Sequence, residues 1–205
     1  SADFRTPALR YPLPHAERVA MLGQRLQMIE RRAKYLLLRF DQGTMLIHLG
    51  MSGSLRLVTP GLAVEKHDHV DLGFGQGVEK IVLRFRDPRR FGALLWIPGE
   101  ACQVNAHPLL AVLGIEPLSD DFTARWLHEA LTGLGAPIKP TLMDSHRVVG
   151  IGNIYASEGL FRAGIAPRRR AGKVSLRRLE RLVPEIKTGL LSAIEAKGQQ
   201  RLGLN

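Results

Sequence analysis

Residues 150–161 read Gly-Ile-Gly-Asn-Ile-Tyr-Ala-Ser-Glu-Gly-Leu-Phe. Two glycines followed by Asn153 and an apolar helical pattern predict a tight turn that opens a helix, because glycine adopts backbone angles that other residues resist. The first N–H groups of a helix have no partner within it and the helix dipole is positive there, so the turn is a candidate anion site. An ordinary turn between two helices would show the same glycines, and this alternative stays open here.

The composition favours a polyanionic partner. The chain has 205 residues, 45% of them hydrophobic, and a formal net charge of +10. This apolar content is enough to fill a core, and the length allows one large domain or two small ones. A charge excess of this size is typical of proteins that bind nucleic acid, although a basic protein without such a partner would show it too.

Cysteine usage and hydropathy exclude several classes of protein. Cys102 is the only cysteine, so the chain has no internal disulfide and no Cys-x-x-Cys zinc pair, and Cys102 is most simply a small buried apolar residue. No apolar run approaches the roughly 20 residues that span a bilayer. Residues 1–5, Ser-Ala-Asp-Phe-Arg, do not resemble a signal peptide. We therefore expect a cytoplasmic protein that does not bind membranes.

Residues 24–97 show the patterns of β-strands. Short apolar runs at 35–38 and 45–47 are separated by the turn signal Asp-Gln-Gly at 41–43. Apolar and polar residues alternate at 53–58 and 69–74, which is the pattern of a strand with one buried face and one solvated face.

Residues 81–86 alternate in the same way. Ile81, Leu83 and Phe85 share one face of the predicted strand, whereas Arg84 and Arg86 share the other. The pattern predicts that the apolar face is buried and that the arginine face contacts water. Many short strands of this kind are typical of an antiparallel sandwich.

The pattern becomes helical after a segment at 98–120 that carries Pro-Gly-Glu at 98–100, His-Pro at 107–108 and Glu-Pro at 116–117. From Phe122 onward, apolar residues recur at helical spacing. Ser175 is a candidate helix cap, and Pro184 is expected to begin a new helix because proline is favoured in the first helical turn.

The two patterns together predict an α+β protein. We expect an antiparallel β-sandwich domain at 1–105, a linker at 106–121 and a helical domain at 122–205. A cleft between two such domains is the expected place for a ligand.

Two loops carry candidate nucleic-acid contacts. Residues 87–92, Asp-Pro-Arg-Arg-Phe-Gly, predict a tight loop with two arginines and an aromatic ring at its tip. Arginine contacts phosphates or base edges and phenylalanine inserts between stacked bases, while a salt-bridged hairpin with Phe91 in the core is the alternative. In residues 48–53, His-Leu-Gly-Met-Ser-Gly, two glycines hold Met51 on a turn where it could project, although methionine more often fills a core.

Lysine and histidine residues near the strands are further candidates. Lys34 lies just before an apolar strand and is, on local sequence alone, a solvated strand-end lysine. His67 and His69 are two residues apart, which places both imidazoles on one face of a strand. A metal pair is conceivable there, but no third ligand is evident, so no metal site is predicted.

A basic segment follows the Gly-x-Gly turn. Between residues 162 and 187 the sequence has nine lysines and arginines and two glutamates. This segment is either a solvated helix face or an electrostatic footprint for phosphates, and binding through such a footprint weakens steeply with salt.

Taken together, these motifs are similar to those of the formamidopyrimidine-DNA glycosylase family, bacterial enzymes that excise oxidised purines. The resemblance runs from about Arg10 to Glu195. It implies a β-sandwich followed by a helical domain with a helix-two-turn-helix DNA-binding motif. It also implies a monomeric DNA-repair glycosylase with AP lyase activity, which excises 8-oxoguanine and formamidopyrimidines and binds double-stranded DNA with an oxidised base or an abasic site.

The resemblance further implies roles for residues of this chain. An enzyme that acts on a base extrudes it from the stack and leaves a void, and the positions that match Met51, Arg89 and Phe91 fill this void in the family. Lys34 becomes the catalytic candidate, near the DNA backbone and the elimination chemistry. The remaining implied DNA contacts are His48, His67, Lys139, Gly152, Asn153 and Tyr155.

Two features of the family pattern do not occur in these 205 residues. Family members begin with Pro-Glu, whose proline amine attacks the sugar C1′ to form a Schiff base, and they carry a four-cysteine zinc finger near the carboxyl terminus. This chain begins at Ser1 and has one cysteine, so we expect no cofactor in it. An incomplete copy of the enzyme and a catalytically inactive protein that binds damaged or abasic-site DNA are both open interpretations, and an RNA-binding relative is a third.

Overall fold

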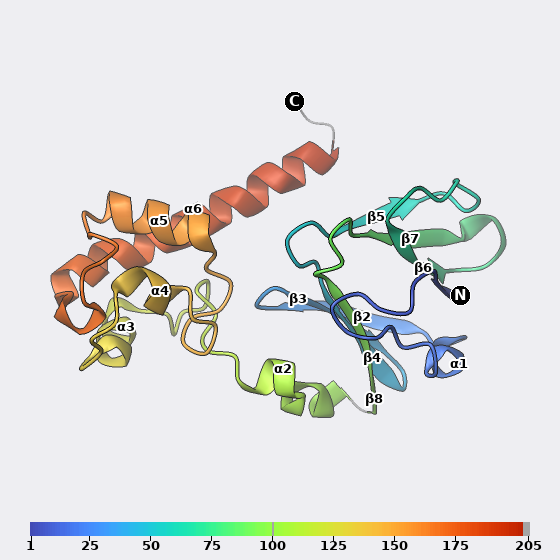
Figure 1. Ribbon diagram of the computed structural model, residues 1–205, viewed down its shortest axis with the longest axis horizontal. Helices are drawn as coiled ribbons and strands as arrows, with labels where there is room; N and C mark the ends of the chain where they lie inside the picture. The colour runs from blue at the N-terminus through green and yellow to red at the C-terminus, as the bar shows by residue number, and fades with distance from the viewer. Residues whose placement is uncertain (100, 203–205) are drawn as a thin grey trace. The chain divides into compact units, whose positions relative to one another are not determined.

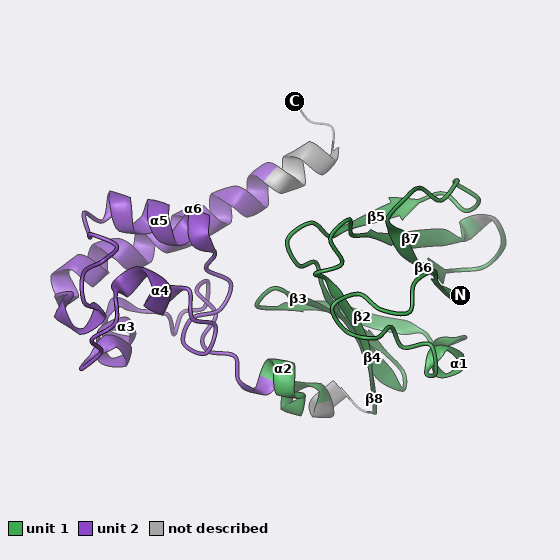
Figure 2. Cartoon of the chain, viewed as in Figure 1, with its two compact units in different colours: residues 1–110 green, residues 111–205 purple. Residues whose placement is uncertain are grey.

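The computed structural model describes residues 1–99 and 101–202, without the side chains of residues 78, 101–103 and 197–202. The side chain of Cys102, expected to be buried, thus lies outside the described part. The chain divides into two compact units, Ser1–Leu110 and Ala111–Asn205 (Figure 2).

Unit 1 contains two four-stranded antiparallel sheets (Figure 1). The first sheet has the strand order β2-β3-β4-β8, formed by β2 (Leu26–Arg32), β3 (Tyr35–Phe40), β4 (Gly43–His48) and β8 (Ala93–Pro98). The second sheet has the order β1-β6-β7-β5, formed by β1 (Ala2–Phe4), β6 (Asp68–Phe74), β7 (Ile81–Arg86) and β5 (Ser54–Val58). The helices α1 (Arg18–Met21) and η1 (Gly77–Glu79) lie in connections between strands, and η2 (Ala101–Ala106) and α2 (Pro108–Ala111) follow β8.

The two sheets enclose one apolar core, as expected for a sandwich. Its buried side chains come from both sheets and from the loop before α1, and they include Leu38, Met45, Ile47, Val70, Leu72, Phe85, Leu94 and Trp96. The predicted α+β class and antiparallel sandwich are confirmed. Sequence patterns did not indicate β1, which pairs with β6 along Ala2–Phe4.

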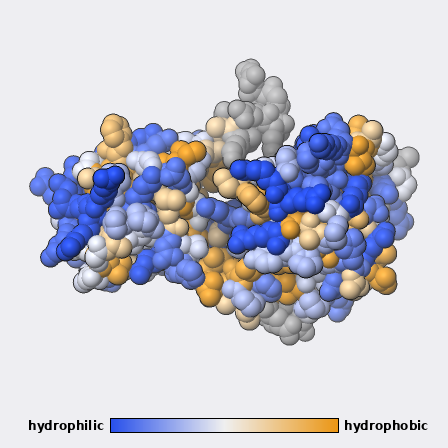
Figure 3. All heavy atoms as spheres, viewed as in Figure 1, coloured by the Kyte–Doolittle hydropathy of each residue, from blue (hydrophilic) through white to orange (hydrophobic). Residues whose placement is uncertain are grey.

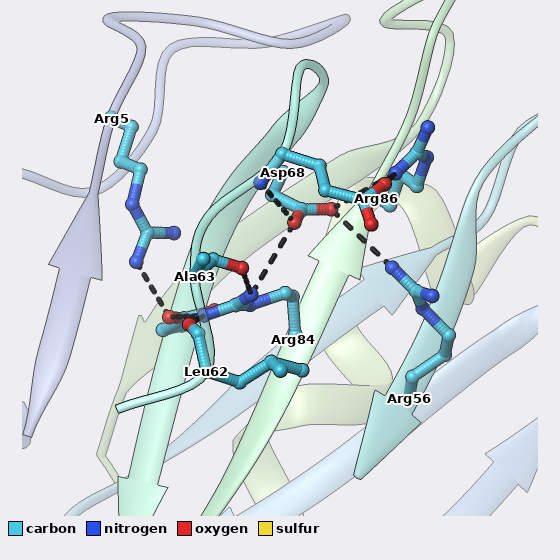
Figure 4. A network of polar contacts seen from close by, with 9 residues as sticks. Arg5, Arg56, Leu62, Ala63, Asp68, Arg84 and Arg86 are labelled. Atoms are coloured by element: carbon cyan, nitrogen blue, oxygen red, sulfur yellow. Dashed lines mark hydrogen bonds and ion pairs between the residues drawn. The ribbon is translucent and has the colours of Figure 1, made fainter. Parts of the chain in front are cut away.

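The predicted water-facing position of Arg84 on β7 is wrong. Its side chain is 4% exposed and reaches Asp71 on the neighbouring strand, with Nε 2.8 Å from Oδ1 and Nη2 2.9 Å from Oδ2 (Figure 4). Burial raises the pKa of Asp71, but hydrogen bonds from Arg84 and Arg5 outweigh this and hold it below its ordinary value. The carboxylate therefore stays charged and paired inside the sheet.

The loop between β5 and β6 covers Arg84 and shields it from solvent. Arg84 donates from Nη1 to the carbonyl oxygen of Ala63 at 2.8 Å and from Nη2 to that of Leu62 at 3.1 Å, so the loop lies across the arginine. Asp68, 4% exposed, lies 3.4 Å from Arg84. At the other end of the strand, Ile81 is 49% exposed, so the alternation in the sequence does not separate buried from solvated side chains here.

Unit 2 is helical. It comprises α3 (Ala124–Leu131), α4 (Ile138–Leu142), α5 (Asn153–Arg162), η3 (Ala171–Lys173) and α6 (Leu176–Leu202). The helices share a core whose buried side chains include Phe122, Leu127, Ile138, Leu142, Ile151, Leu160, Leu182 and Ile186. Thr123 caps α3, because its hydroxyl accepts a hydrogen bond from the Trp126 N–H at 3.1 Å.

The expectation that Pro184 begins a new helix is wrong, because Pro184 lies inside α6. A proline within a helix removes one hydrogen bond and costs about 3 kcal/mol. Burial of Val183 and Ile186 on either side of it offsets this cost. Gly159 permits the close packing of α5 on α6, since an added Cβ there would lie 3.0 Å from Cγ1 of Ile186.

Among the described residues, no helix combines the length and apolar character required to cross a membrane.

Candidate nucleic-acid interface

The Gly-x-Gly turn opens α5, as the sequence predicted. Gly150 has φ +77°, a backbone conformation that favours glycine. Gly152 is the N-cap residue and has no side chain that could accept a hydrogen bond from the helix. The first intrahelical bond runs from the Ala156 N–H to the Gly152 carbonyl at 2.9 Å, so the N–H groups of residues 153–155 have no partner within the helix. This helix end is suited to hold an anion.

The other predicted contacts of unit 2 lie at the starts of α4 and α5. Asn153 is the exposed first residue of α5, and Tyr155 is partly buried against the helical core. Lys139 lies in the first turn of α4, and its backbone N–H donates to the carbonyl of Pro167 at 3.3 Å. Lys139, Gly152, Asn153 and Tyr155 thus belong to one unit.

In unit 1 the two predicted loops, residues 48–53 and 87–92, pack directly on each other. Gly50 has φ +63°, and an added Cβ would lie 2.6 Å from the backbone carbonyl carbon of Phe91. At Gly92 an added Cβ would lie 2.9 Å from the carbonyl oxygen of His48. Side chains at either position would force the loops apart, so the glycines are required by this contact.

Asp87 fastens the two loops together. Its side chain is fully buried, and Oδ1 accepts a hydrogen bond from the Ser52 hydroxyl at 2.5 Å while Oδ2 accepts one from the Gly92 N–H at 2.7 Å. The Ser52 hydroxyl oxygen also accepts from the Arg89 N–H at 3.3 Å. We call Ser52 and Asp87 the loop clasp. Its two members are 35 residues apart, so no local sequence pattern indicates it; an aspartate before proline in a tight loop is the available signal.

The clasped loops present exposed side chains. Met51 is 74% exposed and Phe91 50% exposed, so neither fills a core. The Arg89 guanidinium carbon lies 5.4 Å from the centre of the Phe91 ring, within the range of a cation–π contact. The structure therefore brings the three predicted void-filling residues onto adjacent loops, and their role in filling a void stays a prediction.

Lys34 and His48 lie near each other beside these loops. Lys34 is exposed in the two-residue turn between β2 and β3. Burial, followed by the charges of Arg10 and Lys34, lowers the pKa of His48 below its ordinary value of 6.5. Nδ1 of His48 accepts a hydrogen bond from the Gly50 N–H at 2.9 Å, which places the proton of the neutral ring on Nε2. His48 is thus a neutral donor that also supports the Met51 loop.

His67 departs from its expected position. It precedes β6 and has φ +76°, so it does not share a strand with His69. The two rings still approach, with centroids 6.2 Å apart. The His67 carbonyl accepts from the Asp87 N–H at 3.0 Å, and Nε2 of His69 donates to the Asp87 carbonyl at 3.0 Å. Both histidines therefore brace the 87–92 loop.

Comparison with known proteins identifies the family. The sequence models of the formamidopyrimidine-DNA glycosylase N-terminal domain and H2TH domain match residues 1–94 and 113–202. A formamidopyrimidine-DNA glycosylase of Dechloromonas aromatica is 56% identical over 200 residues, covering 95% of this chain and 70% of the relative. The chain belongs to the formamidopyrimidine-DNA glycosylase family. It is thus a DNA-repair glycosylase by family membership.

Further relatives of this glycosylase agree. The formamidopyrimidine-DNA glycosylase of Aromatoleum aromaticum is 54% identical over 196 residues, covering 96% of this chain and 70% of the relative. A Lactococcus lactis Fpg in complex with Fapy-dG-containing DNA matches with a TM-score of 0.83 at 30% identity, covering 95% of this chain and 72% of that one. The same enzyme in complex with abasic-site DNA matches with a TM-score of 0.83 at 31% identity, covering 95% and 70%.

These 205 residues contain one cysteine, so they do not by themselves supply the four thiolates of the zinc finger that the resemblance implies. In the part of the chain that the structure describes, no three His, Cys, Asp or Glu residues are grouped so that they could hold a metal ion.

Proposed function

We propose that this glycosylase binds duplex DNA that contains an oxidised purine or an abasic site, and that Met51, Arg89 and Phe91 occupy the space left by the extruded nucleotide. The observation that carries the proposal is the pair of clasped loops, which hold two exposed apolar side chains and an arginine together. Apolar wedges between bases and an arginine facing the unpaired base are the chemistry that an extruded nucleotide requires.

Phosphate contacts are proposed at both units. In unit 2, the unpartnered N–H groups at the start of α5, with Asn153 and Lys139, suit a backbone phosphate. In unit 1, the neutral His48 donates from Nε2, and Lys34 adds a positive charge nearby. His67 is proposed as a further contact beside the 87–92 loop. These contacts position the duplex and carry no sequence information.

The reaction proposed for this binding is the excision of 8-oxoguanine and formamidopyrimidines, followed by AP lyase cleavage. Support comes from relatives that carry the name formamidopyrimidine-DNA glycosylase and from solved Lactococcus lactis complexes with Fapy-dG and abasic-site DNA. An amine nucleophile attacks C1′ of the sugar, the base leaves, and the resulting Schiff base permits elimination of the 3′ phosphate. Lys34 is proposed to act near this elimination.

Binding is tested by fluorescence anisotropy with a duplex that carries a tetrahydrofuran abasic analogue and with an undamaged duplex. We expect tighter binding to the abasic duplex, and Met51→Ala and Phe91→Ala should reduce this preference. Leu57→Ala is the matched control, because Leu57 is 71% exposed on β5 and belongs to neither loop. Equal affinity for the two duplexes would contradict the proposal.

Excision is tested by borohydride trapping on an 8-oxoguanine duplex, with the 205-residue chain and with a version that begins with the family's Pro-Glu segment. An adduct from the extended version alone supports excision with the proline amine as nucleophile. An adduct from the 205-residue chain that Lys34→Gln abolishes would assign the nucleophile to Lys34. Abasic-site binding without an adduct from either version would refute excision and favour a binding protein.

A further inference from the structure

A row of cations in unit 2 lies outside the site described above. The loop between α5 and α6 and the first turns of α6 carry six exposed basic side chains, which we call the arginine ridge: Arg168, Arg169, Arg170, Lys173, Arg177 and Arg181. In Figure 3, strongly hydrophilic side chains gather at the end of unit 2 that carries this loop. Within the described residues, no carboxylate forms an ion pair with any member of the ridge.

The ridge is held on an ordered support. The Ile138 N–H donates to the carbonyl of Arg169 at 2.8 Å, and the Ala171 N–H donates to the carbonyl of Ala136 at 2.8 Å. The Arg169 side chain turns back, with Nε donating to the Lys173 carbonyl at 3.1 Å. The loop therefore has a defined backbone. Its positive charges could move apart only if these hydrogen bonds were broken, which would cost free energy.

The support also connects the ridge to the proposed phosphate site. The Lys139 N–H donates to the carbonyl of Pro167, the residue before Arg168, at 3.3 Å, and Pro137 forms a β-bridge with Arg170. Lys139 and the first arginines of the ridge thus lie on two strands of chain joined by backbone hydrogen bonds. A duplex that contacts Lys139 would continue onto the ridge.

We propose that the arginine ridge binds the phosphate backbone of the duplex that flanks the lesion. The proposal rests on the function proposed above and extends the DNA footprint beyond the extruded nucleotide. Fixed, unpaired like charges repel one another in the free protein, whereas B-DNA presents one negative charge per about 1.7 Å of axis and releases counterions when these are neutralised. Duplex DNA fits better than a small anion because the six cations extend from the loop into α6.

The test compares two triple variants of the full chain on two lengths of duplex. The ridge variant is Arg168→Gln, Arg170→Gln and Arg177→Gln. The control variant removes three exposed arginines outside the ridge, Arg18→Gln, Arg25→Gln and Arg125→Gln. Each protein is titrated with a tetrahydrofuran duplex of about 10 base pairs and one of about 30, over a range of salt concentrations, after circular dichroism has shown equal helicity.

On the long duplex, the negative slope of log K against log salt should become shallower by up to about 2.7 for the ridge variant, since each neutralised phosphate contributes about 0.9 to its magnitude. The control variant should keep the original slope, and the short duplex should bind both variants alike. Equal slopes for the two variants on the long duplex would overturn the proposal, as would an equal loss on both lengths. If the ridge variant lost affinity for structured RNA and kept its affinity for duplex DNA, the ridge would be an RNA contact and the proposal would also be overturned.

Failure of the proposed function gives a different result. If the unsubstituted chain does not distinguish the short abasic duplex from a short undamaged one, lesion recognition fails. The comparison of slopes on the long duplex still reports whether the ridge contacts DNA.

Discussion

Replacing Ser52 by alanine removes one half of the loop clasp, the hydroxyl that contacts Asp87 and the Arg89 N–H. The hydroxyl donates to Oδ1 of Asp87 at 2.5 Å, and Asp87 is fully buried. A hydrogen bond to a charged group contributes about 1.5–3 kcal/mol, and a buried acceptor that loses its partner costs a similar amount. The Arg89 N–H also loses its acceptor, but it is exposed and water replaces it. We therefore expect the free energy of unfolding of unit 1 to fall by about 2 kcal/mol.

Urea unfolding followed by tryptophan fluorescence measures this change. With a slope of about 2 kcal/mol per molar urea, the midpoint should fall by about 1 M. Thr132→Ala is the matched control, because its hydroxyl bonds an exposed helical carbonyl, that of His128, at 2.9 Å. We expect a change below about 0.5 kcal/mol for this control.

The clasp can also be tested by DNA binding, in a measurement that a general loss of stability would not change. Ser52→Ala should weaken binding to the abasic duplex more than to the undamaged duplex, because the Met51 and Phe91 loops lose their common anchor. Ser52→Thr keeps a hydroxyl and should restore the preference. If Ser52→Ala keeps both the wild-type midpoint and the wild-type preference while Met51→Ala loses the preference, the clasp does not position the loops.

Three further substitutions have defined outcomes. Gly50→Ala should destabilise unit 1 by about 1–3 kcal/mol in urea unfolding, because it places a Cβ 2.6 Å from the Phe91 backbone at φ +63°. Arg84→Met should cost about 3–5 kcal/mol in the same assay, since it removes the buried cation that Asp68 and Asp71 share and leaves them only partners that are more exposed. The lowered pKa of the half-buried His48 makes its contribution to stability complete above about pH 6.5 and lost as the pH falls through the folded-state pKa. His48→Gln should therefore flatten the pH dependence of stability below pH 6.5, with a residual slope from His69, whose pKa burial also lowers.

Local sequence patterns correctly predicted the features that depend on one strand, one turn or one helix. The turn signal at 41–43 correctly joins β3 to β4, and the Gly-x-Gly turn correctly opens α5. Arg84 could not be placed in this way, because its partners lie on β6 and in the loop after β5. The prediction of a helix start at Pro184 was wrong for a similar reason, because the packing of α6 on α5 outweighs the local cost of the proline.

The candidate site shows the same division. The glycines around Met51 and the proline before Arg89 indicated two turns with projecting side chains, and exposure of Met51 and Phe91 agrees with projection. The clasp between the turns depends on a pairing of residues 35 positions apart, which no local pattern contains. Sequence alone therefore predicted which side chains project and missed what holds them.

The stability of unit 1 does not explain this arrangement. Met51 and Phe91 would stabilise the fold more if they were buried, since burial of such a side chain contributes about 1.5–3 kcal/mol. Instead, a fully buried carboxylate, a serine hydroxyl and close-packed glycines hold the two loops so that both side chains face solvent. Buried charge and restricted backbone are costs to the free protein. They are understandable if the exposed side chains are buried elsewhere, in the stack of a duplex from which a nucleotide has been extruded.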